Sequence, residues 1–89
     1  MASLRTTAPP KRVMESVRSV AEGVAGVTEV EKCRIRKSGL GMFVDIHVVV
    51  DGRMSVRDGH ALSHEVKDRL LGQVPGIQDV LVHIEPSEQ

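Results

Sequence analysis

Histidines and carboxylates alternate in two segments of this chain in a way that could bind a metal ion. His47 follows Asp45 by two positions, and Glu85 follows His83 by two positions. Because side chains two apart on a β-strand point to the same side, each pair would share the polar side of its strand. Neutral imidazole nitrogens and carboxylate oxygens are ligands that zinc takes at about 2.0 to 2.2 Å. If the two strands are neighbours, we expect His47, His83 and Glu85 to form the core of a metal site.

The alternative for each histidine considered singly is a polar residue on the solvated side of a sheet. The His-x-Glu pattern on one strand, beside another strand that carries a histidine, favours the metal site over this alternative. Three ligands from one chain leave a place for water or for a fourth residue.

A second histidine pair lies in a segment with helical periodicity. His60 and His64 form H-x-x-x-H, a spacing that puts both rings on one side of a helix and can chelate a metal. The zinc-protease motif is His-Glu-x-x-His, but Ala61 follows His60, so proteolysis is poorly supported. A solvated position beside Lys67 is the simpler interpretation for His64, whereas both alternatives stay open for His60. With no serine or carboxylate pair in a convincing catalytic arrangement, we do not expect an enzyme.

Composition excludes several classes of partner. Twelve basic residues balance twelve acidic ones, and the chain has no tyrosine or tryptophan. It therefore lacks both the positive field and the stacking platforms that nucleic-acid binding requires. Cys33 is the single cysteine, so we expect no disulfide within the chain and a reducing, cytoplasmic location. Its side chain is expected to act as a small buried hydrophobic group. The longest apolar stretch, residues 42–50, is interrupted by polar residues and is shorter than the roughly 20 residues of a membrane span, so we expect no membrane insertion.

Periodicity predicts five elements in the order helix, strand, strand, helix, strand. Residues 1–8 are expected to form a flexible tail, and residues 9–89 one domain. The first helix starts at a proline pair and ends near Gly23, and Ser55 is expected to cap the second. The predicted strands cover residues 27–37, 42–50 and 77–85. This order predicts an α+β sandwich in which two helices cover one face of a three-stranded sheet and leave the other face open.

The residues also resemble a known family. The run GVTEVEKCRIRKSGLGMFVDIHVVVDGRMSVRDGHALSHEV, followed by PGIQDVLVHIEP, is similar to the cytoplasmic C-terminal domain of cation diffusion facilitator transporters. The resemblance covers roughly residues 10–86. It depends on an ordered set of motifs: R-x-R-x-S-G, a D-x-H strand, G-H at a helix start, and V-H-x-E-P.

This resemblance implies a ferredoxin-like, metallochaperone-like fold that dimerises and binds a divalent metal, usually zinc. The family's ligand positions match His47, His60, His83 and Glu85 in this chain. Some members have a further ligand at the start of the first strand, where this sequence has Glu31, a possible additional metal ligand. The six-helix membrane part of such transporters does not precede the domain here, so we expect either an excised domain or an independent soluble member.

The chain is therefore predicted to be a homodimeric, zinc-type metal-binding domain of a cation efflux system. It would have a regulatory or metal-sensing role and would close on metal binding. The metal would be Zn²⁺ or another divalent first-row ion, with His60 adding to the site from its own chain or from a partner subunit. A membrane cation transporter is a possible partner. The alternatives are a metal-independent protein interaction module and a soluble metal carrier.

Overall fold

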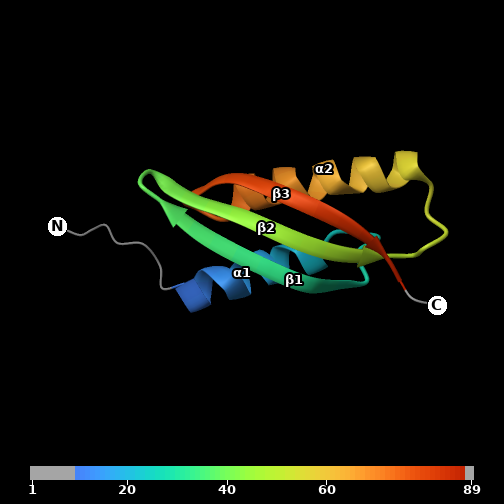
Figure 1. The fold of residues 1–89 in the computed structure, drawn as a ribbon, viewed down its shortest axis with the longest axis horizontal. Coiled ribbons are helices and arrows are strands. Elements are labelled where there is room, and N and C mark those ends of the chain that lie inside the picture. The colour runs from blue at the N-terminus through green and yellow to red at the C-terminus, as the bar shows by residue number, and fades with distance from the viewer. Residues whose placement is uncertain (1–9, 88–89) are drawn as a thin grey trace.

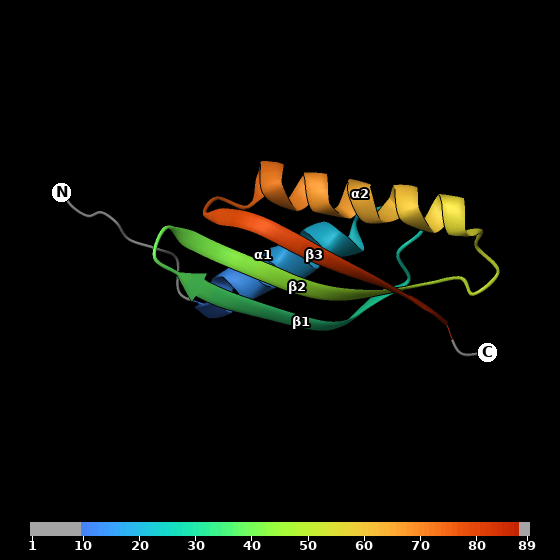
Figure 2. The same ribbon diagram turned by 45° about the horizontal axis from the view of Figure 1, so that its top comes forward.

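The five predicted elements are present in the computed structural model, which describes residues 10–87 (Figure 1). The elements are α1 (Pro10–Glu22), β1 (Glu29–Ser38), β2 (Gly41–Val50), α2 (Val56–Gln73) and β3 (Ile77–Pro86). The sheet has the strand order β1-β2-β3, in which β2 pairs antiparallel with β1 and parallel with β3. Both helices lie on one face of the sheet and leave the other face uncovered (Figure 2). The predicted fold class is therefore confirmed, whereas the tail predicted for residues 1–8 lies outside the described residues.

The central strand shows why this chain folds into two layers. Every second side chain of β2 enters the core, and each of these is at most 5% exposed: Met42, Val44, Ile46, Val48 and Val50. The intervening side chains of β2 point to the uncovered face and are only partly buried. Strict alternation over ten residues therefore fixes which side chains are available on the open face.

Helix α2 places a single apolar stripe on the sheet. Its buried residues recur at helical spacing: Gly59, Leu62, Val66 and Leu70. The side chain of Ser55 caps the helix by accepting a hydrogen bond from the backbone N–H of Asp58 at 3.0 Å, as predicted. The helix ends at Gln73, and the backbone N–H of Val74 still donates a hydrogen bond to the carbonyl of Leu70 at 3.1 Å. Among the residues described, neither helix is long and apolar enough to cross a membrane.

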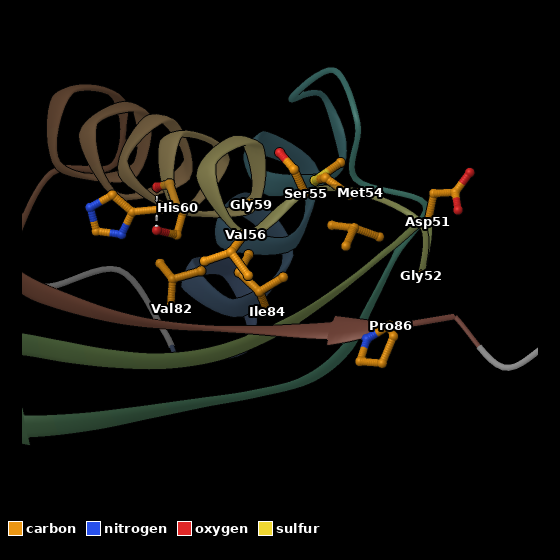
Figure 3. A pocket seen from close by; sticks show the side chains of 12 residues that line it. Asp51, Gly52, Met54, Ser55, Val56, Gly59, His60, Val82, Ile84 and Pro86 are labelled. Atoms are coloured by element: carbon orange, nitrogen blue, oxygen red, sulfur yellow. Dashed lines mark hydrogen bonds between the residues drawn. The ribbon is translucent and has the colours of Figure 1, made fainter.

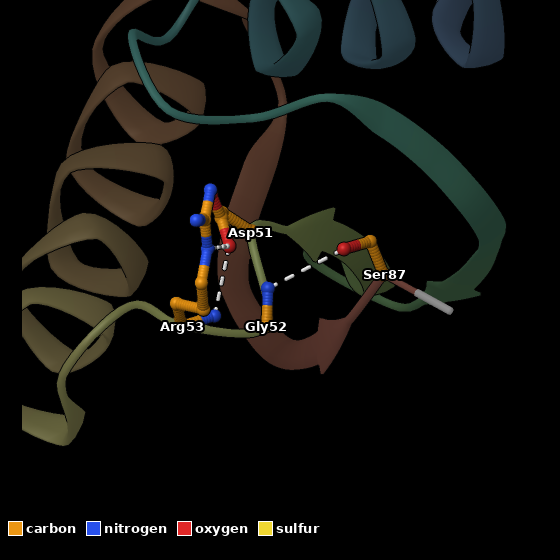
Figure 4. Close-up of polar contacts among 4 residues, drawn as sticks. All are labelled: Asp51, Gly52, Arg53 and Ser87. Carbon is orange, nitrogen blue, oxygen red and sulfur yellow. Dashed lines mark hydrogen bonds and ion pairs between the residues drawn. The ribbon is translucent and has the colours of Figure 1, made fainter. Parts of the chain in front are cut away.

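The turn between β2 and α2 holds the end of β3 in place (Figure 4). Asp51 accepts hydrogen bonds from the backbone N–H of Arg53 at 2.8 Å and from its guanidinium at 3.0 and 3.2 Å. The backbone N–H of Gly52 donates to Ser87 Oγ at 3.3 Å, and the N–H of Ser87 donates to the carbonyl of Val50 at 2.8 Å. These bonds join the ends of the parallel strands β2 and β3, and Ser87 lies two residues beyond Glu85.

Candidate metal centre

Two histidines lie side by side on the uncovered face of the sheet. His47 on β2 and His83 on β3 are register partners in the parallel pair of strands. Their rings stack, with centroids 4.2 Å apart and planes 10° from parallel. The structure thus brings together the two imidazoles that the alternating pattern assigned to the polar sides of separate strands.

Asp45 directs a carboxylate oxygen at both rings. Its Oδ1 atom lies 2.9 Å from His83 Nε2 and 3.9 Å from His47 Nε2. That oxygen is buried and has no hydrogen-bond partner with acceptable geometry among the described residues, although the ring of His83 is close to it. A buried carboxylate oxygen requires a positive or hydrogen-bonding partner, which either an imidazolium at His83 or a bound cation would supply.

The separations within this group fit a bound metal. Ligand bonds of 2.0 to 2.2 Å in a tetrahedron put neighbouring ligand atoms about 3.4 Å apart. The two measured distances from Asp45 Oδ1 lie on either side of this value, and the three ligand atoms of Asp45, His47 and His83 all lie within 4.8 Å of one another. Because the two rings are stacked, coordination by all three groups would require both rings to turn toward a shared ion.

Glu85 contacts the other nitrogen of the His47 ring. Its Oε2 atom lies 2.6 Å from His47 Nδ1. The hydrogen bond from His47, and next that from Glu31, lowers the pKa of Glu85, so this group is an ionised carboxylate that can only accept. His47 Nδ1 therefore carries the hydrogen, and in the neutral ring the Nε2 lone pair lies on the side of Asp45. A carboxylate behind a histidine in this way fixes the tautomer and orientation of a metal ligand.

A β-bulge brings Glu31 to the same place. Val30 pairs with Val48 and Lys32 pairs with His47, so one residue of β1, Glu31, is left over at the shift in register. Its carboxylate forms a second possible group with His47 Nδ1 and Glu85, again within 4.8 Å. The hydrogen bond with Glu85, and next the negative charge of Glu85, raises the pKa of Glu31.

The structure does not bring His60 to this cluster within one chain. His60 lies on α2, which packs on the opposite face of the sheet, and its ring is next to that of His64. It borders a hollow of about 360 Å³ between the start of α2 and the end of β3 (Figure 3). The predicted contribution of His60 to the sheet cluster therefore requires a second subunit.

Sequence reasoning placed Asp45 on the polar side of its strand but did not include it among the ligands. The signal was the D-x-H pattern, which puts Asp45 and His47 on one face. What was missing was the order of the strands, since His83 completes the group only because β3 is the neighbour of β2. Cys33 is half-buried against the core, where burial raises the pKa of its thiol, in agreement with the predicted role as a small hydrophobe.

Comparison with known proteins identifies the family. Residues 9–87 match the family described as the cytoplasmic domain of cation efflux proteins, and the chain belongs to it. Metal tolerance protein C1 of Arabidopsis thaliana is 30% identical over 78 residues, which are 88% of this chain and 17% of that protein. The cation-efflux pump FieF of Yersinia pestis (strain Pestoides F) is 30% identical over 84 residues, or 94% of this chain and 28% of the pump. The chain thus spans less than a third of either relative, and the resemblance seen in the sequence is confirmed.

Solved structures agree on the fold. A MamM CTD variant superposes with a TM-score of 0.85 at 25% identity, covering 89% of this chain and 95% of the other. A nickel form of another MamM CTD variant gives a TM-score of 0.84 at 26% identity, covering 88% and 99%. The family description also agrees with the cytoplasmic location predicted from the sequence.

Proposed function

We propose that this domain binds a divalent cation on its uncovered sheet face and regulates a cation efflux system as a homodimer. The observation that carries the proposal is the buried Oδ1 atom of Asp45, which has no hydrogen bond and faces the Nε2 atoms of two stacked histidines. The relatives named as a cation-efflux pump and a metal tolerance protein support a role in metal export.

Asp45, His47 and His83 are the proposed ligands. Glu85 orients the ring of His47 and balances the charge of the ion, and Glu31 lies behind Glu85. The competing ligand set is Glu31, His47 and Glu85, which uses the other nitrogen of His47. Since one neutral imidazole offers one lone pair, His47 serves one set at a time. His60 enters either set only from a partner subunit.

The ion is a first-row divalent metal, and zinc is the one we expect. Imidazole suits zinc, nickel and copper, and the carboxylate does not exclude any of them. The nickel form of the MamM CTD supports this class of ion for the fold. Because ligation requires neutral imidazole, affinity should fall as the pH drops below the ordinary imidazole pKa of about 6.5.

Regulation follows from the charge on the open face. Three carboxylates gather there, from Glu31, Asp45 and Glu85, on a surface that no helix covers. Where two such clusters approach each other in a dimer, their carboxylates repel each other, and Lys32 and Arg34 of β1 lie beside them on the same face. A bound divalent cation would supply the positive charge that removes this repulsion, and the population would shift toward a closed dimer.

Isothermal titration calorimetry with zinc tests the proposal. We expect saturable binding to the wild-type chain and at least a roughly hundredfold loss of affinity in His83→Ala, which removes a proposed ligand. Asp79→Asn is the matched control, since this carboxylate also lies on β3 but pairs with Lys67 at 3.3 Å, outside the cluster. Absence of zinc binding to the wild-type chain would replace this proposal with a metal-independent interaction module.

A further inference from the structure

The turn between β1 and β2 presents a leucine that the described part of the chain leaves uncovered. Leu40 is 91% exposed. Its backbone is nevertheless fixed, because Gln78 Nε2 donates to the carbonyl of Leu40 at 3.2 Å and the backbone N–H of Met42 donates to the carbonyl of Gly76 at 2.9 Å. A Cβ on Gly41 would lie 3.0 Å from that same Gly76 oxygen, so the turn packs closely against the loop before β3. An apolar side chain is therefore held in solvent on a turn that the rest of the fold keeps in place.

Basic side chains extend from both sides of the strand that leads to this turn. Arg36 pairs with Phe43 and Lys37 pairs with Met42, and both basic residues are exposed. Because Met42 enters the core whereas Phe43 faces the uncovered side, Arg36 and Lys37 lie on opposite sides of β1. The guanidinium of Arg36 lies 5.1 Å from the centroid of the Phe43 ring. Among the ion pairs of residues 10–87, none includes Arg36 or Lys37, so both charges are available to a partner.

Charge is distributed unevenly along the molecule, although the chain has no net charge. The first turn of α1 and the last residues of β1, 10–13 and 34–38, contain basic residues and no acidic one. Both segments lie at the hairpin end, opposite the start of α2 (Figures 1 and 2). The opposite end has two arginines, Arg53 and Arg57, against a larger set of carboxylates: Glu22, Glu29, Asp51, Asp58 and Glu85. The long dimension of 50 Å is several times the screening length of about 8 Å at physiological ionic strength, so a surface at the hairpin end meets mainly positive charge.

We propose that the hairpin tip, consisting of Arg36, Lys37 and Leu40, contacts the anionic surface of a phospholipid membrane. The basic side chains would pair with lipid phosphates, and the leucine would enter the boundary between headgroups and acyl chains without crossing the bilayer. The family description gives a cytoplasmic domain, and the cytoplasmic leaflet carries anionic lipid. Charged residues on an edge strand also discourage pairing between sheets, but that role requires no exposed leucine.

The shape and composition of the tip favour a lipid surface over another polyanion. A turn at the end of an elongated domain suits a flat surface (Figure 1). A nucleic acid would offer phosphates but no apolar layer for Leu40, and the chain has no tyrosine or tryptophan on which bases could stack. The contact requires no bound metal and is therefore independent of the cluster on the sheet.

Co-sedimentation with lipid vesicles tests this contact. With a chelator present and at low salt, the wild-type chain should bind vesicles of equal parts phosphatidylcholine and phosphatidylglycerol and should not bind vesicles of phosphatidylcholine alone. Arg36→Glu should weaken binding roughly 20-fold or more, because it changes the charge by two units and each is worth about fivefold near an anionic surface. Arg57→Glu is the matched control, since it makes the same change in charge at an exposed position at the opposite end and should keep wild-type binding.

Leu40→Ala tests the apolar part of the contact. It should weaken binding about fivefold to tenfold, less than for a fully buried leucine because the headgroup region is only partly apolar, and should leave the salt dependence unchanged. Wild-type binding in this variant would show that the leucine does not enter the membrane. Circular dichroism checks that each variant keeps its fold.

Three results would overturn the membrane contact. The first is failure of the wild-type chain to bind anionic vesicles. The second is an equal loss in Arg36→Glu and Arg57→Glu, which would mean that net charge and not the tip decides binding. The third is binding of a labelled single-stranded RNA as tightly as of anionic vesicles. Because every measurement is made in chelator, these results leave the metal proposal as it stands, and a failure of zinc binding leaves the membrane contact as it stands.

Discussion

The ring of His47 contacts carboxylates through both of its nitrogens. Nδ1 donates to Glu85 at 2.6 Å, and Nε2 lies 3.9 Å from Asp45. The two carboxylates therefore have different roles if a cation binds: Asp45 shares the ion with His47, whereas Glu85 holds the ring. Substitution of each carboxylate by its amide distinguishes these roles.

Asp45→Asn should abolish measurable zinc binding or reduce affinity at least about a hundredfold, because a charged ligand is lost. Glu85→Gln should reduce affinity only about 10- to 100-fold and keep the stoichiometry, as expected for a group that orients a ligand. Calorimetry on both variants provides the comparison. The reverse order of effects would show that Glu31, His47 and Glu85 are the ligands instead.

Glu31 shows where prediction from sequence ends at this scale. Simple alternation along β1 puts Glu31 on the same side as Cys33 and Ile35, which face the core. The bulge between Val30 and Lys32 breaks that alternation and brings the carboxylate to the open face beside Glu85. Nothing in the local sequence marks a bulge, so only the resemblance to a family pointed to Glu31.

At the scale of elements, α2 stabilises the sheet through one stripe of side chains. Leu70 is fully buried, whereas its neighbour Leu71 is 38% exposed. Leu70→Ala should lower the free energy of unfolding by about 2 to 5 kcal/mol, since it leaves a cavity. Leu71→Ala should change it by no more than about 0.5 kcal/mol. Urea unfolding measures both, and equal effects would contradict the assignment of the buried stripe.

The turn after β2 predicts a particular response to acid. The hydrogen bonds from Arg53 lower the pKa of Asp51 from its ordinary 3.8 to about 2. A lowered pKa in the folded state gives stability that is present above pH 3.8 and is lost as the pH falls toward 2. Asp51→Asn should therefore flatten the fall in stability between pH 4 and pH 2, with a modest effect because the pair is exposed to solvent.

Thermal unfolding followed by circular dichroism across this pH range measures the effect. Asp68→Asn, an exposed aspartate on α2, is the control and should retain the wild-type slope. If Asp51→Asn also retains that slope, the turn does not contribute to acid sensitivity.

The sequence predicted where each helix and strand lies in the chain better than it predicted which elements lie next to each other in space. The hydrophobic pattern gave the buried side of β2 and the stripe of α2 because both depend on local periodicity. Strand β3 could join either edge of the hairpin formed by β1 and β2. The choice depends on the crossover through α2, and local periodicity does not contain that information. The pairing of His47 with His83 follows from this tertiary choice.

At the scale of the molecule, an uncovered sheet face in so small a domain favours assembly. Leu81 is 58% exposed, and Phe43 is a half-buried member of the same strand face as Asp45, so apolar surface adjoins the acidic cluster. A domain of this size buries a limited core, and a second subunit would cover more apolar surface. Apolar contact favours the dimer, while the three carboxylates oppose its closure.

The balance between these two effects predicts a change of shape with metal. The domain is elongated, with extents of 50 × 20 × 19 Å, so a change in the angle between two subunits alters the radius of gyration of the dimer. Small-angle X-ray scattering should show a more compact dimer with saturating zinc than with a chelator. The His47→Ala/His83→Ala variant should remain at the metal-free value in both conditions, because its open face cannot hold the neutralising ion. Equal compaction in that variant would mean that zinc acts at another site, and an unchanged wild-type dimer would mean that binding does not control closure.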